Sequence, residues 1–254
     1  MTKQQSVKEI TQLLLTDMLS EEQLQLLHMD ERKGVQTALK KYLKRKEKAQ
    51  QLETQFYRML QYEQKAYQQG KNIVVGVDEV GRGPLAGPVV AAAVVLDKDV
   101  YLPGINDSKQ MSRAKRESFY EQLTTSAVTY SFGIVDNQMI DQINIYQATI
   151  RAMKQAVAGL THQPDHLLVD AVDLSDLPYS SEAIIKGDQK SISIAAASIL
   201  AKVKRDNMMA ELHQMYPQYG FDQNQGYGTK THLAAITKYG ITPYHRQSFA
   251  PIKT

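Results

Sequence analysis

Cysteine is absent from this chain of 254 residues, which excludes disulfides and thiolate metal sites. Long apolar runs are absent too: the longest, Val89–Leu96, is far shorter than the roughly 20 residues that span a bilayer. The N-terminus carries neither a signal-peptide nor a transit-peptide pattern. We therefore expect a soluble protein of the reducing cytoplasm that has no membrane partner.

Residues 71–254 have no excess of positive or negative charge, and the net positive charge of the chain comes from residues 1–70. Residues 1–70 carry 12 Lys and Arg against 9 Asp and Glu, whereas residues 71–254 carry 18 of each. A neutral segment of this kind does not indicate nucleic-acid binding through its overall charge. Any inference of that kind has to come from local motifs.

Proline is absent from residues 1–70, which are rich in Gln, Lys, Glu and Leu. Two serines stand three residues ahead of Glu9 and Gln23, as in a capping box. We expect a helical N-terminal extension, 1–70, of two short helices and one long one, ending at Gly70. Its basic run, residues 40–48, is either a solvated helix face or an arm that contacts a nucleic-acid backbone.

From Lys71 the sequence changes to β-branched strands that later alternate with helices, which predicts an α/β domain, 71–254, with a mixed central β-sheet flanked by helices. The expected strands are Ile73–Asp78, Val89–Leu96, Ala127–Val135, His166–Val172 and Glu182–Lys186. The expected helices are Ser112–Leu123, Asp136–Leu160, Ile192–Met215 and a C-terminal segment, Thr229–Lys238.

Three apolar stretches of this domain each run into an aspartate: Asp78, followed at once by Glu79, then Asp170 and Asp188. Any one aspartate after a strand could cap the next helix, Asp188 most of all because Ser191 and a helical run follow. Asp78 is not explained in this way, since another strand follows it. A carboxylate at the end of a buried strand loses several kcal/mol of hydration unless a charge compensates it. Mg²⁺ and Mn²⁺ prefer oxygen ligands, so the pattern favours a metal site.

The glycines after Glu79 loosely match a dinucleotide-binding fingerprint at Gly81, Gly83 and Ala86. We reject that match, because the fingerprint requires a helix and here Pro84 and Pro88 lead into a strand. Glycines also let backbone amides approach a phosphate or a sugar closely, with Arg82 nearby as a charged fork. A tight turn without a ligand remains the alternative.

Several motifs in order make the chain resemble bacterial ribonuclease HII from residue 71 to about 251. These motifs are Val77-Asp-Glu-Val-Gly-Arg-Gly-Pro-Leu-Ala-Gly-Pro-Val89, Asp107-Ser-Lys109, Asp170, Lys186-Gly-Asp188, Ala195-Ala-Ala-Ser-Ile-Leu-Ala-Lys-Val-Lys-Arg-Asp206 and Gly226-Tyr-Gly-Thr-Lys-Thr-His232. The sister family, ribonuclease HIII, lacks the Arg-Gly-Pro-Leu-Ala-Gly-Pro run and has a strand-rich N-terminal domain.

The resemblance implies an RNase H-like fold and a monomeric endonuclease that cuts RNA in DNA·RNA hybrids. It also implies cleavage of duplex DNA on the 5′ side of a single ribonucleotide, leaving 3′-hydroxyl and 5′-phosphate ends with two Mg²⁺ or Mn²⁺ ions. By position, the metal ligands are Asp78, Glu79, Asp170 and Asp188. The resemblance also implies that the loop of Gly81, Arg82 and Gly83 grips the backbone around the ribose and that Tyr227 senses the 2′-hydroxyl.

Three cations, Lys109, Lys202 and Arg205, are candidate phosphate contacts. Lys109 could also be a solvated surface residue, and the other two could pair with Asp206 or Glu211. The six histidines form no nucleophile–base arrangement, so we interpret each as a surface or capping residue.

Two rival functions remain open at this point. A structure-specific nuclease, such as a junction resolvase, would cut all-DNA substrates with the same acidic residues. A non-catalytic nucleic-acid binding module would bind without metal and form no products, although an acidic cluster repels phosphate unless cations are bound. The sequence does not decide the role of residues 1–70, the preferred metal, any protein partner, or the balance between primer removal and repair.

Overall fold

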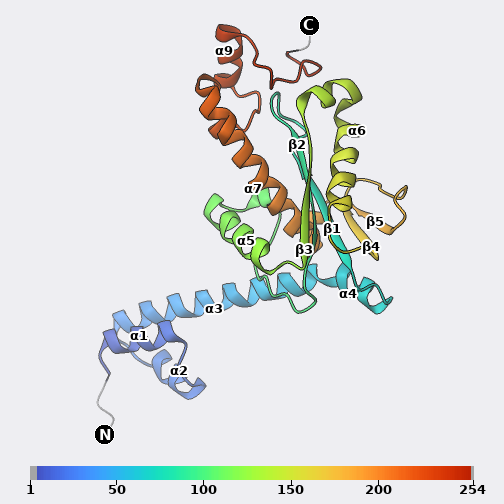
Figure 1. Cartoon of the computed structure of the whole chain (residues 1–254). Coiled ribbons are helices and arrows are strands. Elements are labelled where there is room, and N and C mark those ends of the chain that lie inside the picture. The colour runs from blue at the N-terminus through green and yellow to red at the C-terminus, as the bar shows by residue number, and fades with distance from the viewer. Residues whose placement is uncertain (1–4, 253–254) are drawn as a thin grey trace. The chain divides into compact units, whose positions relative to one another are not determined.

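The computed structural model describes residues 5–252, which divide into two units, one ending at Gln55 and one beginning at Phe56. Figure 1 shows the helices and strands of both units along the chain. Within the described part of the chain, no helix is both long and apolar enough to cross a membrane.

The first unit is helical, as expected, and contains α1 (Val7–Thr16), α2 (Glu21–His28) and most of α3 (Lys33–Met59). The stretch up to Gly70 holds three short helices rather than the two predicted, because the long helix ends at Met59 and α4 (Gln61–Gln68) follows it in the second unit. Ser6 with Glu9 and Ser20 with Gln23 form the two capping boxes that their spacing predicts. The buried side chains of the unit form a small apolar core of Ile10, Leu14, Leu27, Val35, Leu39 and Tyr42.

The basic run of residues 40–48 lies within α3. Two of its charges are used inside the unit, because Lys46 pairs with Asp17 and Arg45 donates to the carbonyl oxygen of Leu14. The other lysines of the run, Lys40, Lys41, Lys44 and Lys48, are exposed. This arrangement is compatible with a solvated face and with a nucleic-acid contact.

The second unit is built on one five-stranded sheet in the order β3-β2-β1-β4-β5. The first three strands pair antiparallel and the last two run parallel to β1 and β4, so the sheet is mixed as expected. The strands are β1 (Val74–Val80), β2 (Val89–Val95), β3 (Thr129–Val135), β4 (His166–Asp170) and β5 (Ser180–Ile184).

Two long helices cover opposite faces of this sheet, α6 (Asn137–Ala158) and α7 (Ile192–Met215) (Figure 1). Strand β2 shows why both faces are apolar. Its alternate residues from Val89 to Val95 pack with α6, whereas Ala92 and Val94 pack with α7. The sheet is therefore the middle of three layers.

The remaining helices surround these layers. They are α4 (Gln61–Gln68), α5 (Arg113–Ser126), α8 (Phe221–Asn224) and α9 (Lys230–Tyr239), with 3-10 turns η1 (Ser108–Gln110), η2 (Gly187–Gln189) and η3 (Pro217–Tyr219). Three helices begin at the polar caps that the sequence offers: Asp136 for α6, Ser191 for α7 and Thr229 for α9.

Several strand boundaries differ from the prediction: β3 begins two residues later than expected and β4 ends two residues earlier, at Asp170. Strand β1 continues past Asp78 to Val80, because Glu79 and Val80 still pair with β2. Strand β5 begins and ends two residues earlier than expected. Ile185 is exposed and Lys186 has a left-handed backbone with φ 56°, so the apolar Ile184-Ile185 pair does not extend the strand.

Candidate active site

Neighbouring parallel strands bring the first three predicted acidic residues together. Val77 of β1 pairs with Val169 of β4, so the next residues along the two strands, Asp78 and Asp170, stand side by side. Glu79 follows on β1. Asp188 lies on η2 rather than at a strand end, and the backbone amide of its neighbour Gly187 donates to Asp170 Oδ1 over 2.7 Å. The structure thus brings all four carboxyl groups into one cluster, in which they influence one another electrostatically.

The electrostatics of these carboxylates reflect their burial and mutual repulsion. Burial, with the charges of Glu79 and Asp170, raises the pKa of Asp78 well above its ordinary value. Burial also raises the pKa values of Glu79 and Asp170, although Arg82 opposes the first shift and the Gly187 amide the second. The pKa of Asp188 rises to about 6 through burial and the charges of Asp107 and Asp170. The cluster therefore favours either protons or bound cations.

The chemistry of the donor set fits a hard divalent cation. Glu79 Oε2 is buried and has no hydrogen-bond partner among residues 5–252, and its other oxygen lies 3.5 Å from Arg82 Nη1. A carboxylate oxygen left in this state gains most from a positive ion. Within the same described residues, no three acidic or histidine side chains are already arranged to enclose one ion.

A fifth acidic residue, Asp107, belongs to the same cluster, although the sequence suggested it only as part of a motif. It is buried, caps η1 by accepting from the amide of Lys109, and accepts from Gln189 Nε2 beside Asp188. The sequence signal that could have identified it is the polar turn Asn106-Asp107-Ser108 between apolar segments.

Lys109 lies within the field of these carboxylates. Burial alone would lower its pKa, but the charges of Asp78, Asp107, Asp188 and Glu79 outweigh burial, and the pKa is raised. An exposed ammonium beside an acidic site is available to a phosphate group. This position is compatible with both interpretations of Lys109, a phosphate contact and a solvated surface lysine.

The loop of Gly81, Arg82 and Gly83 connects β1 to β2, and no helix follows it, so rejection of the dinucleotide fingerprint is confirmed. Gly81 has φ +97°, and a Cβ there would lie 2.3 Å from Arg205 Nε. Glycine is therefore required both for the backbone conformation and for close packing.

Two buried arginines hold this loop through its carbonyl oxygens. Arg205 donates to Pro88, Ala86 and Gln225, and Arg246 donates to Gly81, Arg82 and Gly87. The proposed phosphate contact for Arg205 is therefore wrong, because its side chain is fully buried. Lys202 pairs with Asp206, as one of its two interpretations expected.

Tyr227 lies against the same loop. A Cβ built on Gly83 would stand 3.5 Å from Tyr227 Cε1, and the tyrosine is 46% exposed. Its backbone amide donates to Asn224, which fixes the turn after α8. The glycine loop and the tyrosine, separated by more than a hundred residues, therefore form one surface.

Two histidines contradict their interpretation as surface or capping residues. His232 and His245 are 0% and 1% exposed, and their Nε2 atoms lie 3.0 Å apart. No sequence periodicity signals this contact, because it joins α9 to the irregular segment that follows.

A mixed sheet of this order with acidic residues on its adjacent strands β1 and β4 defines a protein of the ribonuclease H-like class. The family model described as Ribonuclease HII matches residues 75–252, and the Ribonuclease HII N-terminal domain matches residues 6–67. The chain belongs to the ribonuclease HII family and is a type 2 ribonuclease H.

Curated relatives support the same assignment. A ribonuclease HII of Oceanobacillus iheyensis is 53% identical over 250 residues, covering 98% of this chain and 96% of the relative. One of Enterococcus faecalis is 54% identical over 252 residues, with the same coverage. Both matches include the N-terminal helical unit.

Solved structures share the fold of the second unit. The ribonuclease H2 of Pyrococcus horikoshii matches with TM-score 0.62 and 28% identity, covering 71% of this chain and 95% of that one. A ribonuclease HIII solved in complex with Mn²⁺ matches with TM-score 0.55 and 18% identity, covering 74% of this chain and 70% of that one. The second comparison bears on the fold alone.

Proposed function

We propose that this chain is an endoribonuclease that hydrolyses RNA in DNA·RNA hybrids and cuts duplex DNA on the 5′ side of a single ribonucleotide. The products would carry 3′-hydroxyl and 5′-phosphate ends. The observation that carries the proposal is the side-by-side position of Asp78 and Asp170 on adjacent parallel strands, followed by the loop against which Tyr227 lies.

Asp78, Glu79, Asp170 and Asp188 would hold two Mg²⁺ or Mn²⁺ ions. When bound, such ions activate the attacking water and stabilise the leaving 3′-oxygen. The proposal is supported by the buried, unpartnered Glu79 Oε2 and by the raised pKa values of all four carboxyl groups. The Mn²⁺ complex of a ribonuclease HIII with this fold is consistent with the same choice of ion.

The substrate would be read at the surface that Gly81, Arg82, Gly83 and Tyr227 form. A 2′-hydroxyl both donates and accepts hydrogen bonds, and a phenol with nearby backbone groups can satisfy both. Arg82 and Lys109 are exposed cations whose charges both act on Glu79, and they are suited to phosphate oxygens. All the residues invoked belong to the second unit of one chain, so we infer that a monomer suffices.

The test is cleavage of an end-labelled DNA duplex that carries one ribonucleotide, with Mg²⁺, Mn²⁺ or EDTA, beside an all-DNA duplex. We expect metal-dependent cutting only on the 5′ side of the ribonucleotide. A nicked all-DNA control would favour a structure-specific nuclease. Metal-independent binding without products would favour a binding module.

A further inference from the structure

A hydrogen-bonded pair of histidines contacts the backbone of Tyr227 and takes no part in the proposed chemistry. His232 belongs to α9 and His245 to the segment after it, and both are buried against the rings of Tyr219 and Phe221. Their Nε2 atoms are 3.0 Å apart. Two imidazoles in this contact satisfy each other only if one donates and the other accepts.

The two ends of the pair decide which ring donates. The backbone N–H of Thr242 donates to His245 Nδ1 over 2.9 Å, so that nitrogen carries no proton and His245 is protonated on Nε2. His245 Nε2–H then donates to His232 Nε2. The remaining nitrogen, His232 Nδ1, must carry a proton, and it lies 2.9 Å from the carbonyl oxygen of Tyr227, which can only accept.

The resulting series of hydrogen bonds runs in one direction, from Thr242 through His245 and His232 to Tyr227. A second proton on either ring would leave two N–H groups facing each other, so both imidazoles are neutral. Burial acts in the same sense: it lowers the pKa of His232, and burial with the charge of His232 lowers that of His245 to about 4.

This series of hydrogen bonds ends at Tyr227, which faces the Gly81–Gly83 loop. The Tyr227 carbonyl also accepts from the Thr229 amide over 2.8 Å, so the histidine pair and the start of α9 hold it from two sides. At the other end, His245 is followed by Arg246, which donates to the carbonyl oxygens of Gly81 and Arg82. One short C-terminal segment therefore holds both Tyr227 and the loop opposite it.

We propose that the His232–His245 pair is a positioning device that sets Tyr227 against the Gly81–Gly83 loop and so determines how well the enzyme recognises a ribonucleotide. Neither histidine touches substrate. The inference rests on the proposed function, because it gives Tyr227 the recognition of the 2′-hydroxyl. It assigns to two buried residues a role that packing alone would not require.

Two substitutions at one position separate this role from packing. In His232→Asn the side-chain amide N–H can occupy the place of Nδ1–H and still donate to the Tyr227 carbonyl, while the link to His245 is lost. In His232→Gln the longer amide reaches toward His245 and the donor to Tyr227 is lost. Both variants remove the ring and leave a buried amide, and Asn is smaller by one methylene group. A role in packing alone would therefore make His232→Asn the more damaging of the two.

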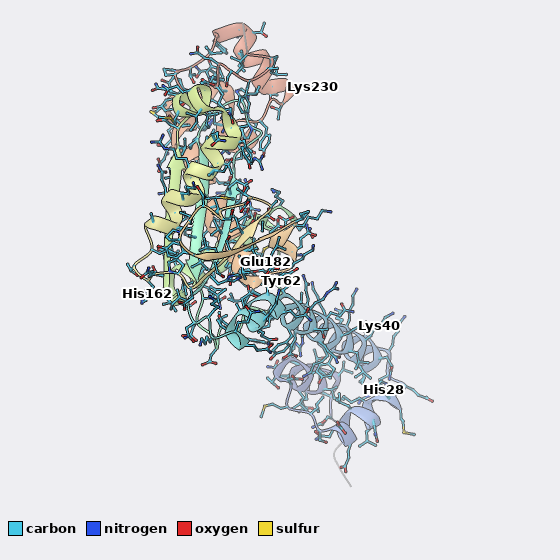
Figure 2. All side chains as sticks on the ribbon, turned by 90° about the vertical axis from the view of Figure 1, so that its right-hand side faces the viewer. His28, Lys40, Tyr62, His162, Glu182 and Lys230 are labelled. Carbon is cyan, nitrogen blue, oxygen red and sulfur yellow. The ribbon has the colours of Figure 1, made fainter. Side chains whose placement is uncertain are left out.

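The measurement is kcat for a duplex with one ribonucleotide, beside the Kd of the same duplex in Ca²⁺ or EDTA. We expect His232→Gln to lower kcat by about tenfold, the factor for one hydrogen bond of ordinary strength, with Kd unchanged. His232→Asn should recover most of the loss. His162→Gln is the control, since His162 is exposed and lies at the opposite end of the unit from Lys230 at the start of α9 (Figure 2).

Equal kcat values for His232→Gln and His232→Asn would overturn the proposal, as would parallel losses in kcat and Kd. Tyr227→Phe, measured alongside, separates the two levels of inference. If Tyr227→Phe cleaves like the unmodified chain, the recognition role of Tyr227 fails. If it is impaired while His232→Gln is not, only the positioning role fails.

A second readout does not depend on cleavage. Long-range ¹H–¹⁵N spectra of the chain labelled at its six histidines report which ring nitrogen carries the proton. At about pH 6, near the ordinary histidine pKa, we expect one neutral ring protonated on Nδ1 and one protonated on Nε2, assigned by the His232→Asn and His245→Asn variants. Two charged rings, or the same tautomer in both, would overturn the hydrogen-bond direction on which the proposal stands.

Discussion

Arg246 Nη2 lies 2.6 Å from the carbonyl oxygen of Gly81, although the two residues are 165 positions apart in the chain. The guanidinium is fully buried, and its other bonds go to the carbonyls of Arg82 and Gly87. A loop of positive-φ glycines has little intrinsic preference for one shape. The shape of this loop is therefore imposed by a cation from the far end of the domain.

Replacement of Arg246 by methionine should destabilise the protein and disorder the loop. The carbonyls of Gly81, Arg82 and Gly87 would lose a buried donor, at a cost of about 2–4 kcal/mol in the free energy of unfolding. Urea unfolding followed by circular dichroism measures this loss, and Arg58→Met, on an exposed arginine, is the matched control. A variant as stable as the control would contradict the assigned role.

Neutralising one central carboxylate should abolish cleavage and spare the fold. We expect Asp78→Asn and Asp170→Asn to show no products while binding a hybrid duplex normally. Because each charge raises the pKa of a neighbour, its removal relieves repulsion, and the metal-free melting temperature should stay the same or rise. An active Asp78→Asn protein would refute the mechanism.

Metal ions should stabilise the unmodified chain and stabilise these variants less. Ligand at 100 times its Kd adds about 2.7 kcal/mol to the free energy of unfolding. We expect the melting temperature to rise with Mn²⁺ and to return to its starting value with EDTA. A rise of the same size in Asp78→Asn would place the bound ion elsewhere.

Removing the phenol of Tyr227 should separate catalysis from binding. Its 46% exposure shows that the side chain contributes little to the core, so Tyr227→Ala should fold normally. We expect cleavage at a single ribonucleotide to fall more than the affinity for the duplex, as measured by single-turnover kinetics and by fluorescence anisotropy. Equal losses would count against recognition of the 2′-hydroxyl.

A buried glutamate supports the helix that follows the acidic turn. Glu63 of α4 accepts from Ser191 Oγ over 2.6 Å and from the Ser193 amide over 3.0 Å, and burial raises its pKa. Glu63→Ala should cost about 1–3 kcal/mol because both donors lose their acceptor. Glu63→Gln keeps the acceptor oxygen and removes the titration, so it should cost less at neutral pH. The free energies of unfolding of the two variants are measured by chemical denaturation. If the charge itself were stabilising, Glu63→Gln would be the less stable of the two.

The histidine pair should make stability depend on pH in one direction. The pKa of His245 is lowered to about 4 in the folded chain, so below pH about 6.5 the unfolded chain binds the additional proton. The free energy of unfolding should therefore be fully retained above that pH and fall as the pH drops toward 4. His245→Asn should show a shallower dependence over the same interval in urea titrations, and an unchanged slope would contradict the neutral pair.

The predictable part of this structure rests on local patterns. Apolar strands ending near Asp78 and Asp170, and caps such as Asp136, are written in residues close together in the chain. The boundary of β5 was wrong because Ile184 and Ile185 look alike in sequence, and only packing distinguishes the buried residue from the exposed one.

The contacts that hold the Gly81–Gly83 loop and Tyr227 could not be predicted in the same way. The ring contact of His232 with His245 and the bond from Arg246 to the Gly81 carbonyl join residues far from any shared local pattern, and their positions depend on the complete fold. Arg205 offered one signal that was available in advance. It lies on the same helical stripe as Ala201 and Met209, four residues to either side, and a cation in such a stripe is buried with them.

The dependence of the β1–β2 loop on Arg246 also orders events during synthesis. The acidic residues and their strands are translated well before the arginine that shapes the loop, since 159 to 165 positions separate Arg246 from its carbonyl partners. A nascent chain that has not yet extended past residue 246 can pair its sheet but lacks this long-range contact. Competence to engage nucleic acid would then arise only after the segment that carries Arg246 has docked on the loop.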